Sequence, residues 1–524
     1  MAVRVRSRSA YVPPTSGRAA VSRSVRTGAL LLAALLTGAA AGCSDGGADS
    51  SRADTSAGQK LDWKSCPAPS DSEDASTGHA PGESWECATL HAPLDYGHPK
   101  GDTIGIALIR AKATDPDRRI GSLLFNFGGP GGSGITTLPA FAEDYKNLRT
   151  RYDLVSFDPR GVGRSDGVKC LGDKDLDSYY AADSTPDDAG ERRALMDRVK
   201  KYAAACEKNS GKVLAHVGTS NAARDMDLMR EALGDDKLHY FGISYGTELG
   251  GVYAHLFPKK VGRALLDGVV DPTHDPVQSA LGQAKGFQLA LGNYLRACAG
   301  SHDNCPTERQ IQRLLGRLDK RPAPAAEGRT LTESLASGGI AQSLYSKDFW
   351  DYLTEGVEDA ENGDGKILLA LGDSMNGRDK DGAYSSLQAS LNAVTCADFK
   401  QRYTVEDIAG KVAEFREASP VFGDFMAWSL TQCTGWPVPG EWKTPDVSAE
   451  GAAPMLVVGN TGDPATPYAG ARKMARRLGE GVGVELTYKG EGHGAYNSGN
   501  GCVKRTVDAY LLDGTVPKAG KVCS

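Results

Sequence analysis

The chain has 524 residues, of which 60 are Lys or Arg and 66 are Asp or Glu, so its formal net charge is −6. This length exceeds one ordinary hydrophobic core and predicts either two domains or one fold with a large insertion. Without the six arginines of the first 26 residues, 54 basic residues remain against 66 acidic ones, a net charge near −12. That balance argues against nucleic acid and anionic membrane surfaces as partners.

The N-terminus has the pattern of an export signal. Six arginines and no acidic residue come first, and the apolar run 28–41 that follows is too short to span a membrane comfortably. We therefore expect a signal peptide over 1–42. Ala40-Ala41-Gly42-Cys43 resembles a bacterial lipobox, which predicts lipidation of Cys43 and anchoring to the outer face of the cell membrane. Leucine is more usual at the Ala40 position, so simple secretion stays open, and residues 43–60 read as a flexible tether.

The cysteine count also indicates export. Ten cysteines follow Cys43, an even number that in an exported protein suggests five disulfides. Neighbours in the sequence close short loops, which favours the pairs Cys66–Cys87, Cys170–Cys206, Cys298–Cys305, Cys396–Cys433 and Cys502–Cys523. A zinc site is the alternative, but there is no C-x-x-C motif and no nearby group of histidines. We expect no metal.

Strand-like and helical segments alternate along most of the chain, which is typical of an α/β fold with a mostly parallel sheet and helices on both faces. The expected strands are 104–109, 122–127, 152–158, 238–241, 264–270, 454–459 and 484–488. Between about 271 and 450, helical patterns dominate and strand patterns nearly vanish. The simplest organisation is a core over 61–271 and 451–524, interrupted by a helical cap over 272–450.

Three copies of G-x-S-x-G occur, centred on Ser44, Ser165 and Ser244. A nucleophilic serine needs a strand that turns sharply into a helix, with flanking glycines that tolerate the strained turn. Only the Ser244 copy follows a strand pattern, and only there does a helical pattern follow. Ser244 is therefore the candidate nucleophile.

A serine nucleophile needs a histidine base, and the histidine needs an acid that fixes its tautomer. In α/β-hydrolases the chain order is Ser, acid, His. His493 is the histidine that satisfies this order, on a glycine-containing loop after the last expected strand. Asp463 closely follows the expected strand 454–459 and is the candidate acid, with Asp271, after the previous strand, as the alternative.

The oxyanion formed in acyl transfer needs backbone N–H donors that are already aimed at it. One should come from Tyr245, the residue after the nucleophile, and the other from the glycine loop 128–134, where Gly129 is the candidate. A phosphate-binding loop is the competing interpretation, but no Lys-Ser/Thr follows and Pro130 removes a donor. We expect no cofactor.

Four motifs together resemble a known family: Gly128-Gly129-Pro130-Gly131-Gly132-Ser133-Gly134, Asp158-Pro159-Arg160-Gly161-Val162-Gly163-Arg164-Ser165, Gly242-Ile243-Ser244-Tyr245-Gly246-Thr247 and Asp463-Pro464-Ala465-Thr466-Pro467. The chain is similar to the actinobacterial tripeptidyl aminopeptidases and mycelium-associated serine proteinases, relatives of the prolyl aminopeptidases among the α/β-hydrolases. The resemblance spans about Trp63 to Cys523. It implies a serine exopeptidase that releases short peptides from free N-termini. Asn126-Phe127 departs from the histidine of prolyl aminopeptidases, which leaves a strict proline preference in doubt.

The same triad serves esterases and lipases, so a secreted esterase or lipase is the alternative function. A lipase cap would offer a broad apolar face, whereas the expected cap carries the acids Glu355, Glu358, Asp359 and Glu361. These acids could bind a substrate ammonium, although a solvated helix face is the plainer interpretation. A non-catalytic relative of a hydrolase is the third hypothesis, and the intact Ser, Asp and His argue against it. We expect a monomer that acts on peptides with a free N-terminus.

Overall fold

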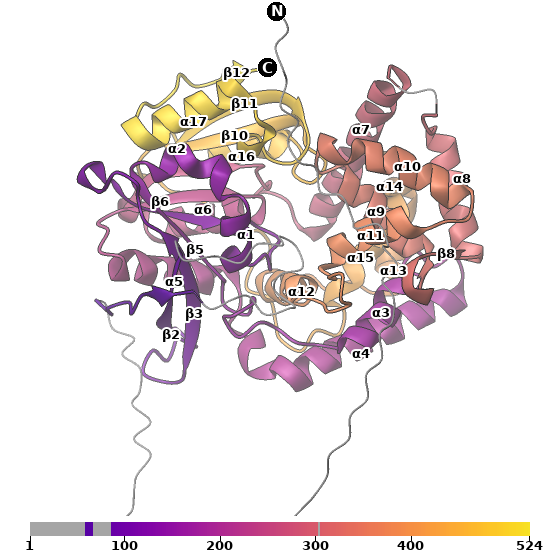
Figure 1. The fold of residues 1–524 in the computed structure, drawn as a ribbon. Helices are drawn as coiled ribbons and strands as arrows, with labels where there is room; N and C mark the ends of the chain where they lie inside the picture. Colours follow the sequence, from indigo (N-terminus) through magenta and orange to yellow (C-terminus); the bar gives the residue numbers. More distant parts are fainter. Residues whose placement is uncertain (1–57, 67–84, 302–303) are drawn as a thin grey trace, which may run out of the picture. The chain divides into compact units, whose positions relative to one another are not determined.

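The computed structural model describes residues 58–66, 85–301 and 304–524. The expected signal peptide, Cys43 and nearly all of the tether lie outside the described residues. Figure 1 traces the described chain from the sheet strands near its start to the helix α17 and strand β12 at its end.

One ten-stranded sheet forms the centre of the core. In sequence order its strands are β1 (Lys64–Ser65), β2 (Glu86–Pro93), β3 (Thr103–Ala111), β4 (Gly121–Asn126), β5 (Tyr152–Phe157), β6 (Leu238–Ile243), β7 (Val261–Asp267), β10 (Met455–Gly462), β11 (Gly483–Glu491) and β12 (Lys521–Cys523). Their spatial order is β1-β2-β3-β5-β4-β6-β7-β10-β11-β12. The pairs β1/β2, β2/β3 and β3/β5 are antiparallel, and the strands from β5 to β12 run parallel. Every residue of β4 and of β5 is buried, as expected for strands covered on both faces.

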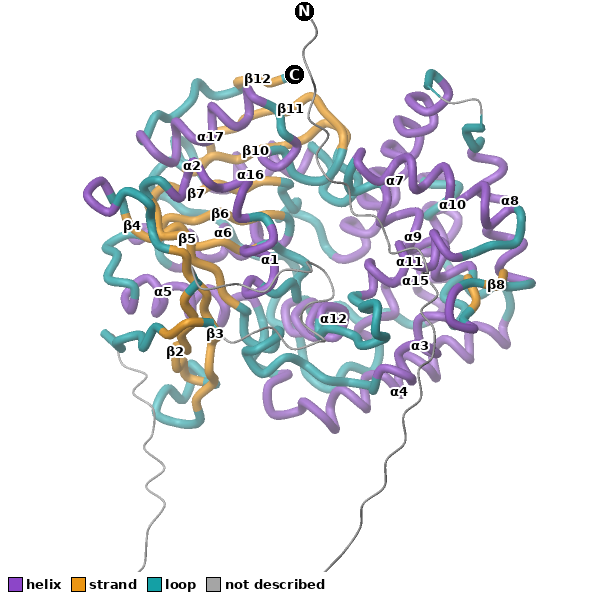
Figure 2. The backbone as a smooth tube through the Cα atoms, in the orientation of Figure 1, coloured by secondary structure: helices purple, strands orange, loops and turns teal. Residues whose placement is uncertain are grey.

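Helices cover both faces of this sheet (Figure 2). One face packs against α1 (Gly134–Ala140), α2 (Lys146–Arg149) and α17 (Gly501–Asp513). The other face packs against α5 (Thr219–Ala232), α6 (Tyr245–Leu256) and α16 (Ala469–Leu478). The strand order and the two helical layers are those of an α/β-hydrolase fold, so the predicted fold class is confirmed. The seven strands expected from the sequence correspond to β3, β4, β5, β6, β7, β10 and β11.

A helical region interrupts the core between β7 and β10. Its helices are α7 (Pro276–Ala299), α8 (Glu308–Lys320), α9 (Glu333–Ser343), α10 (Trp350–Glu361), α11 (Lys366–Asn376), α12 (Leu387–Asp398), α13 (Val405–Ala409), α14 (Val412–Ala418) and α15 (Gly423–Ser429). The short strands β8 (Ala323–Pro324) and β9 (Thr330–Leu331) pair with each other. Most of these helices enclose a hydrophobic cluster of their own, whereas α12 packs onto the core cluster.

Two further helices, α3 (Asp173–Ala181) and α4 (Ala189–Leu214), precede α5 in the sequence. Leu195 and Val199 of α4 pack into the hydrophobic cluster of the helical region, and Tyr202 and Cys206 of the same helix pack into the core. The long helix α4 therefore contributes to both hydrophobic clusters.

Five disulfides join the neighbouring cysteines expected from the sequence: Cys66–Cys87, Cys170–Cys206, Cys298–Cys305, Cys396–Cys433 and Cys502–Cys523. Such a number of bonds is typical of proteins from oxidising compartments. Among the helices that the structure describes, none combines the length and apolar character needed to cross a bilayer.

Candidate active site

Ser244 occupies a sharp turn between β6 and α6. Its φ of 57° and ψ of −125° lie outside the regions that side-chain-bearing residues normally adopt. The turn leaves no room beside it, because a Cβ on Gly128 would lie 2.6 Å from the Ile243 carbonyl oxygen and 2.8 Å from the Ser244 Cβ. Ser244 remains half-buried. This is the strained strand-to-helix turn that a nucleophile elbow requires.

The other two G-x-S-x-G copies lack this setting. Ser44 lies outside the described residues. Ser165 is fully buried, and its hydroxyl donates to the Asp158 carbonyl oxygen at 2.7 Å and accepts the Ala107 N–H at 2.9 Å. Ser165 is therefore a hydrogen-bonded core residue.

The structure brings Asp463 and His493 together. The His493 Nδ1 lies 2.9 Å and 3.0 Å from the two carboxylate oxygens of Asp463, whose side chain is fully buried. The same carboxylate accepts the Thr466 N–H at 2.8 Å and the Thr466 hydroxyl at 2.9 Å. Because a carboxylate only accepts, His493 donates through Nδ1, which leaves Nε2 as the basic nitrogen.

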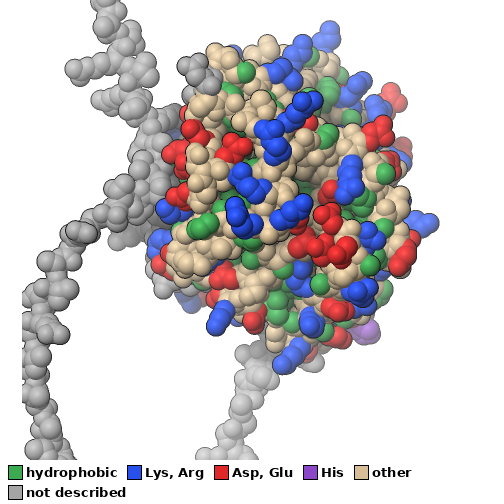
Figure 3. Space-filling model, turned by 90° about the vertical axis from the view of Figure 1, so that its right-hand side faces the viewer, with side chains coloured by type: hydrophobic (Ala, Val, Ile, Leu, Met, Phe, Trp, Pro, Cys, Tyr) green, Lys and Arg blue, Asp and Glu red, His purple; other side chains and the backbone are tan. Residues whose placement is uncertain are grey.

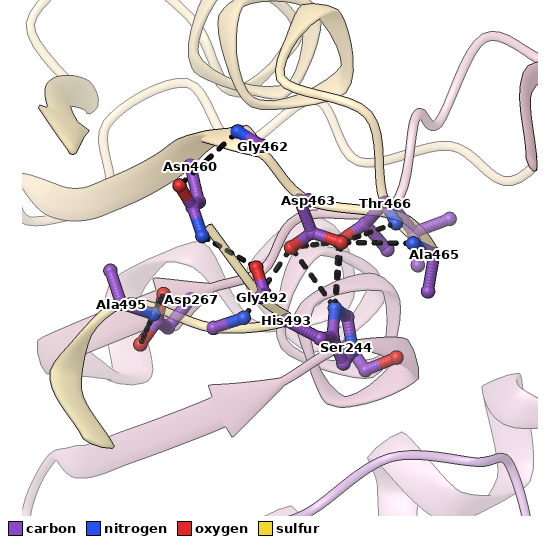
Figure 4. A network of polar contacts seen from close by, with 12 residues as sticks. Ser244, Asp267, Asn460, Gly462, Asp463, Ala465, Thr466, Gly492, His493 and Ala495 are labelled. Atoms are coloured by element: carbon purple, nitrogen blue, oxygen red, sulfur yellow. Dashed lines mark hydrogen bonds and ion pairs between the residues drawn. The ribbon is translucent and has the colours of Figure 1, made fainter. Parts of the chain in front are cut away.

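His493 is set up as a general base. Its side chain is 10% exposed, and its Nε2 is buried with no hydrogen-bond partner among the described residues. Figure 4 shows the Ser244 side chain beside the imidazole. Burial lowers the pKa of His493, but the charge of Asp463 and the hydrogen bond to it outweigh burial, so the pKa is raised above its ordinary value.

Asp267, at the end of β7, holds the loop that carries the histidine. Its carboxylate accepts the Ala495 N–H at 2.9 Å and the Tyr496 N–H at 2.8 Å (Figure 4). Burial raises the pKa of Asp267 to about 6, against the effect of these hydrogen bonds. Asp267 was not among the residues expected from the sequence. Its position, as an acid at the end of an expected strand, could have indicated a role in the site.

The alternative acid, Asp271, is engaged elsewhere. Its carboxylate lies 2.7 Å from the Lys473 Nζ and 3.0 Å from the His274 Nε2. Among the described residues, Asp271 forms no hydrogen bond or ion pair with His493.

Two backbone N–H groups are available for an oxyanion. Within the described chain, neither the Gly129 N–H nor the Tyr245 N–H donates to another protein group. Gly129 is exposed, and the preceding glycine lies against the Ser244 turn. This pair of free donors beside a nucleophile is what acyl transfer requires.

Asp158 and Asn126 hold the glycine loop in shape. Asp158 accepts the Ser133 hydroxyl at 2.7 Å and the Ile135 N–H at 3.2 Å through one oxygen, and the Arg164 N–H at 2.8 Å through the other. Asn126, at the end of β4, accepts the Gly128 N–H at 3.1 Å through its side chain. These contacts explain why the Asp158 motif accompanies the glycine loop.

The helical region touches both loops of the Asp463–His493 pair. The Tyr345 carbonyl oxygen, just after α9, accepts the His493 N–H at 2.8 Å, and the Tyr345 ring packs edge-on against the imidazole with centroids 5.3 Å apart. Gly286 of α7 lies against the Asp463 loop so closely that a Cβ there would be 2.3 Å from the Pro464 carbonyl oxygen. The helical region therefore forms a roof over the loops that carry Asp463 and His493.

The four acids that the sequence offered as ammonium ligands lie on α10. Glu355 and Glu358 are exposed, and Asp359 and Glu361 are half-buried. None of the four forms a hydrogen bond or ion pair with Ser244, Asp463 or His493 in the described structure. This placement supports the interpretation as a solvated helix face.

Other parts of the described structure offer little for a bound group. In the described ranges, no set of three or more His, Cys, Asp and Glu side chains is arranged to hold a metal ion.

An open cavity of about 790 Å³ includes Arg119, His239 and Tyr510 in its lining. It lies at the starts of β6 and β7, the opposite ends from Ser244.

Comparisons with known proteins place this geometry in context. A family model described as TAP-like protein matches residues 419–523. The serine protease Hip1 of Mycobacterium tuberculosis is 38% identical over 457 residues, covering 83% of this chain and 87% of that protein. Carboxylesterase B of the same species is 35% identical, covering 84% and 86%. The tripeptidyl aminopeptidase of Streptomyces lividans is 30% identical, covering 84% and 83%.

Proposed function

Because this chain belongs to the TAP-like family of α/β-hydrolases that includes the tripeptidyl aminopeptidases, we propose that it is an exported serine exopeptidase. It releases short peptides, tripeptides in particular, from free N-termini. The hydrolase class follows from the family. The exopeptidase specificity, the triad and the export are the proposal.

The site geometry supports the following reaction. The Ser244 Oγ attacks the scissile carbonyl carbon while His493 Nε2 accepts the hydroxyl proton, and Asp463 stabilises the imidazolium that results. The Tyr245 and Gly129 N–H groups stabilise the oxyanion. His493 then protonates the leaving amine, which departs and leaves the peptide esterified to Ser244. Water, deprotonated by His493, hydrolyses that ester.

The observation that carries the exopeptidase proposal is the roof over His493. Tyr345 from the helical region binds the histidine loop through its carbonyl oxygen and packs its ring on the imidazole. We expect such a roof to exclude a long folded polypeptide, so that the substrate enters by one end. Binding energy then comes from a few residues and from the terminal ammonium, which buried carboxylates must pair.

A panel of tripeptide p-nitroanilides with free and with acetylated N-termini tests this proposal. Acetylation removes the charge and leaves its carboxylate partners unpaired, which should cost roughly 2–4 kcal/mol, or some 30- to 1000-fold in kcat/KM. Single amino acid and dipeptide anilides establish the length of the released peptide. Equal cleavage of the free and acetylated substrates would contradict the exopeptidase assignment.

An esterase is the second candidate, favoured by the relative named carboxylesterase B. A lipase cap should offer a broad apolar face. In the described part of the cap, Leu289 and Phe349 are the only large hydrophobic side chains that are exposed. The face of the cap seen in Figure 3 carries acidic and basic side chains side by side, with hydrophobic ones only scattered among them. Faster hydrolysis of long-chain esters than of any peptide amide would establish the esterase instead.

The export proposal rests on the five disulfides and on the leader sequence. The protein is either secreted or held on the outer face of the membrane by a lipid on Cys43. Mass spectrometry of the native N-terminus decides between the two, since a diacylated Cys43 means anchoring and a free terminus at another residue means secretion.

A further inference from the structure

A chain of buried hydrogen bonds joins Tyr245, the residue after Ser244, to the cap region. The Tyr245 hydroxyl lies 2.5 Å from the Thr219 Oγ1. Thr219 donates its hydroxyl to one oxygen of Asp398 at 2.6 Å and its N–H to the other at 2.7 Å. Because the Thr219 proton points to Asp398, the Tyr245 hydroxyl donates to Thr219.

The three residues come from distant parts of the sequence. Tyr245 begins α6, Thr219 begins α5, and Asp398 is the last residue of α12, which belongs to the helical region. Thr219 and Asp398 are 179 positions apart. The contact therefore links two core helices to the cap insertion at the point where α6 begins.

The end of α12 is firmly attached. The Cys396–Cys433 disulfide fixes its last turn. Arg402 donates to the Cys396 and Phe399 carbonyl oxygens, which satisfies acceptors at the helix end. The Ser390 hydroxyl, two turns earlier, donates to the Gly161 carbonyl oxygen at 2.6 Å. Asp398 is thus a rigid anchor for Thr219.

All three side chains are removed from solvent. Asp398 is 1% exposed, Thr219 is fully buried and Tyr245 is 7% exposed. Asp398 forms no ion pair in the described part of the chain, and burial together with the nearby Glu248 raises its pKa. A buried carboxylate without a cation is costly, so its hydrogen bonds to Thr219 are the interactions that compensate for its burial.

Tyr245 needs such an anchor because Ser244 before it is strained. Strained backbone persists only where its surroundings hold it. On one side the Ser244 N–H donates to the Asp267 carbonyl oxygen at 3.0 Å. On the other side the buried chain holds the Tyr245 side chain, and with it the peptide that carries the Tyr245 N–H.

We propose that Thr219 and Asp398 are positioning residues that keep the Tyr245 N–H aimed at the oxyanion. The cap region then contributes to the chemical step as well as to access. This inference goes beyond the proposed substrate preference, since it applies equally to a peptide and to an ester.

Tyr245→Phe tests the inference, with Tyr253→Phe as the matched control. Tyr253 is also a buried tyrosine of α6, 2% exposed, and its hydroxyl donates to Asp227 at 3.0 Å, two turns away from the elbow. Both changes remove one buried hydroxyl from the same helix. Tyr245→Phe should lower kcat about 10- to 100-fold and change KM less than threefold, whereas Tyr253→Phe should leave kcat within twofold.

Two further measurements separate positioning from folding. A peptide aldehyde, which forms an oxyanion on Ser244, should bind Tyr245→Phe more weakly by the same factor as the loss in kcat/KM. Thr219→Val should reproduce the kcat loss, Thr219→Ser should restore most of it, and the double variant with Tyr245→Phe should be no worse than the poorer single variant.

The inference is overturned if Tyr245→Phe and Tyr253→Phe have the same kcat, or if the loss lies in KM while aldehyde affinity is unchanged. If Tyr245→Phe does not fold, Asp398→Asn is measured under the same criteria. An activated short ester as substrate keeps this result independent of the exopeptidase proposal, because that ester needs no ammonium site.

Discussion

The core and the cap contribute to the proposed catalytic centre in different ways. The core supplies Ser244, Asp463 and His493, each on a loop directly after a parallel strand. The cap supplies contacts to these loops: Gly286 against the Asp463 loop, Tyr345 against the His493 loop, and Asp398 toward Tyr245 through Thr219. The reacting groups thus come from local strand–loop units, whereas their support comes from residues far away in the sequence.

This difference implies that core substitutions should abolish the reaction and cap substitutions should weaken it. The two classes therefore separate by the size of the effect on kcat.

Ser244→Ala should have the largest effect. Loss of the nucleophile should lower kcat/KM by at least about 10⁴-fold with the fold intact. Ser165→Ala is the matched control, because its buried hydroxyl has two hydrogen bonds and no role in the reaction. We expect that control to lose stability, by about 1–3 kcal/mol, and to retain its activity. Labelling of Ser165 by a fluorophosphonate, rather than of Ser244, would refute the assignment.

Asp463→Asn should lower kcat by about 10³- to 10⁴-fold, because the histidine loses control of its tautomer. Asp271→Asn, with its partners Lys473 and His274, should leave kcat nearly unchanged. Near-normal activity of Asp463→Asn together with an inactive Asp271→Asn would exchange the two roles.

The pH dependence of kcat/KM tests the pairing of Asp463 with His493. His493 must be neutral to accept the Ser244 proton, and its pKa is raised by Asp463. In the wild-type protein kcat/KM should therefore fall as the pH drops, with an apparent pKa above the ordinary 6.5 of histidine. The residual activity of Asp463→Asn should show this acid limb, the fall of kcat/KM at low pH, at a lower pH than the wild-type protein does. A limb at the same pH in both proteins would mean that Asp463 does not act on His493.

The smallest expected effect is on the pH dependence of the free energy of unfolding. Burial raises the pKa of Glu248, in the first turn of α6, from 4.5 to about 7. The folded protein therefore binds this proton more tightly than the unfolded chain, so stability is lost as the pH rises from 4.5 to 7. Glu248→Gln lacks this titrating group and therefore this loss. Between pH 4 and pH 8, the unfolding free energy of the wild-type protein should fall by roughly 2–3 kcal/mol more than that of Glu248→Gln. Denaturant titrations at the two pH values measure it, with the exposed Glu355→Gln as a control that should show no such difference.

The strands, the elbow and the order of Ser, Asp and His could be predicted because their signals are local. Runs of mostly buried residues mark β6 and β10, and Ser244 and Asp463 follow them directly. The strand β11, which precedes the His493 loop, has buried residues at alternate positions in its first half instead. Asp267 follows the same rule and could have been recognised at the end of β7. Its role in holding Ala495 and Tyr496 could not, since that depends on how two loops meet in space.

The cap contacts could not be predicted from the sequence. Tyr345 and Asp398 end ordinary helical patterns, with no glycine loop or strand beside them. Their partners, His493 and Thr219, are far away in the chain, and only the packing of the helices brings them together. Helical periodicity specifies which face of a helix is buried, but not which loop of the core that face contacts.

The most direct test is to identify the covalent intermediate. The enzyme is quenched during turnover of a tripeptide p-nitroanilide with a free N-terminus and of its acetylated twin, and the modified peptide is mapped by mass spectrometry. We expect a tripeptidyl ester on Ser244 from the free substrate and little or none from the acetylated one. An acyl group on another residue, or equal acylation by both substrates, would contradict it.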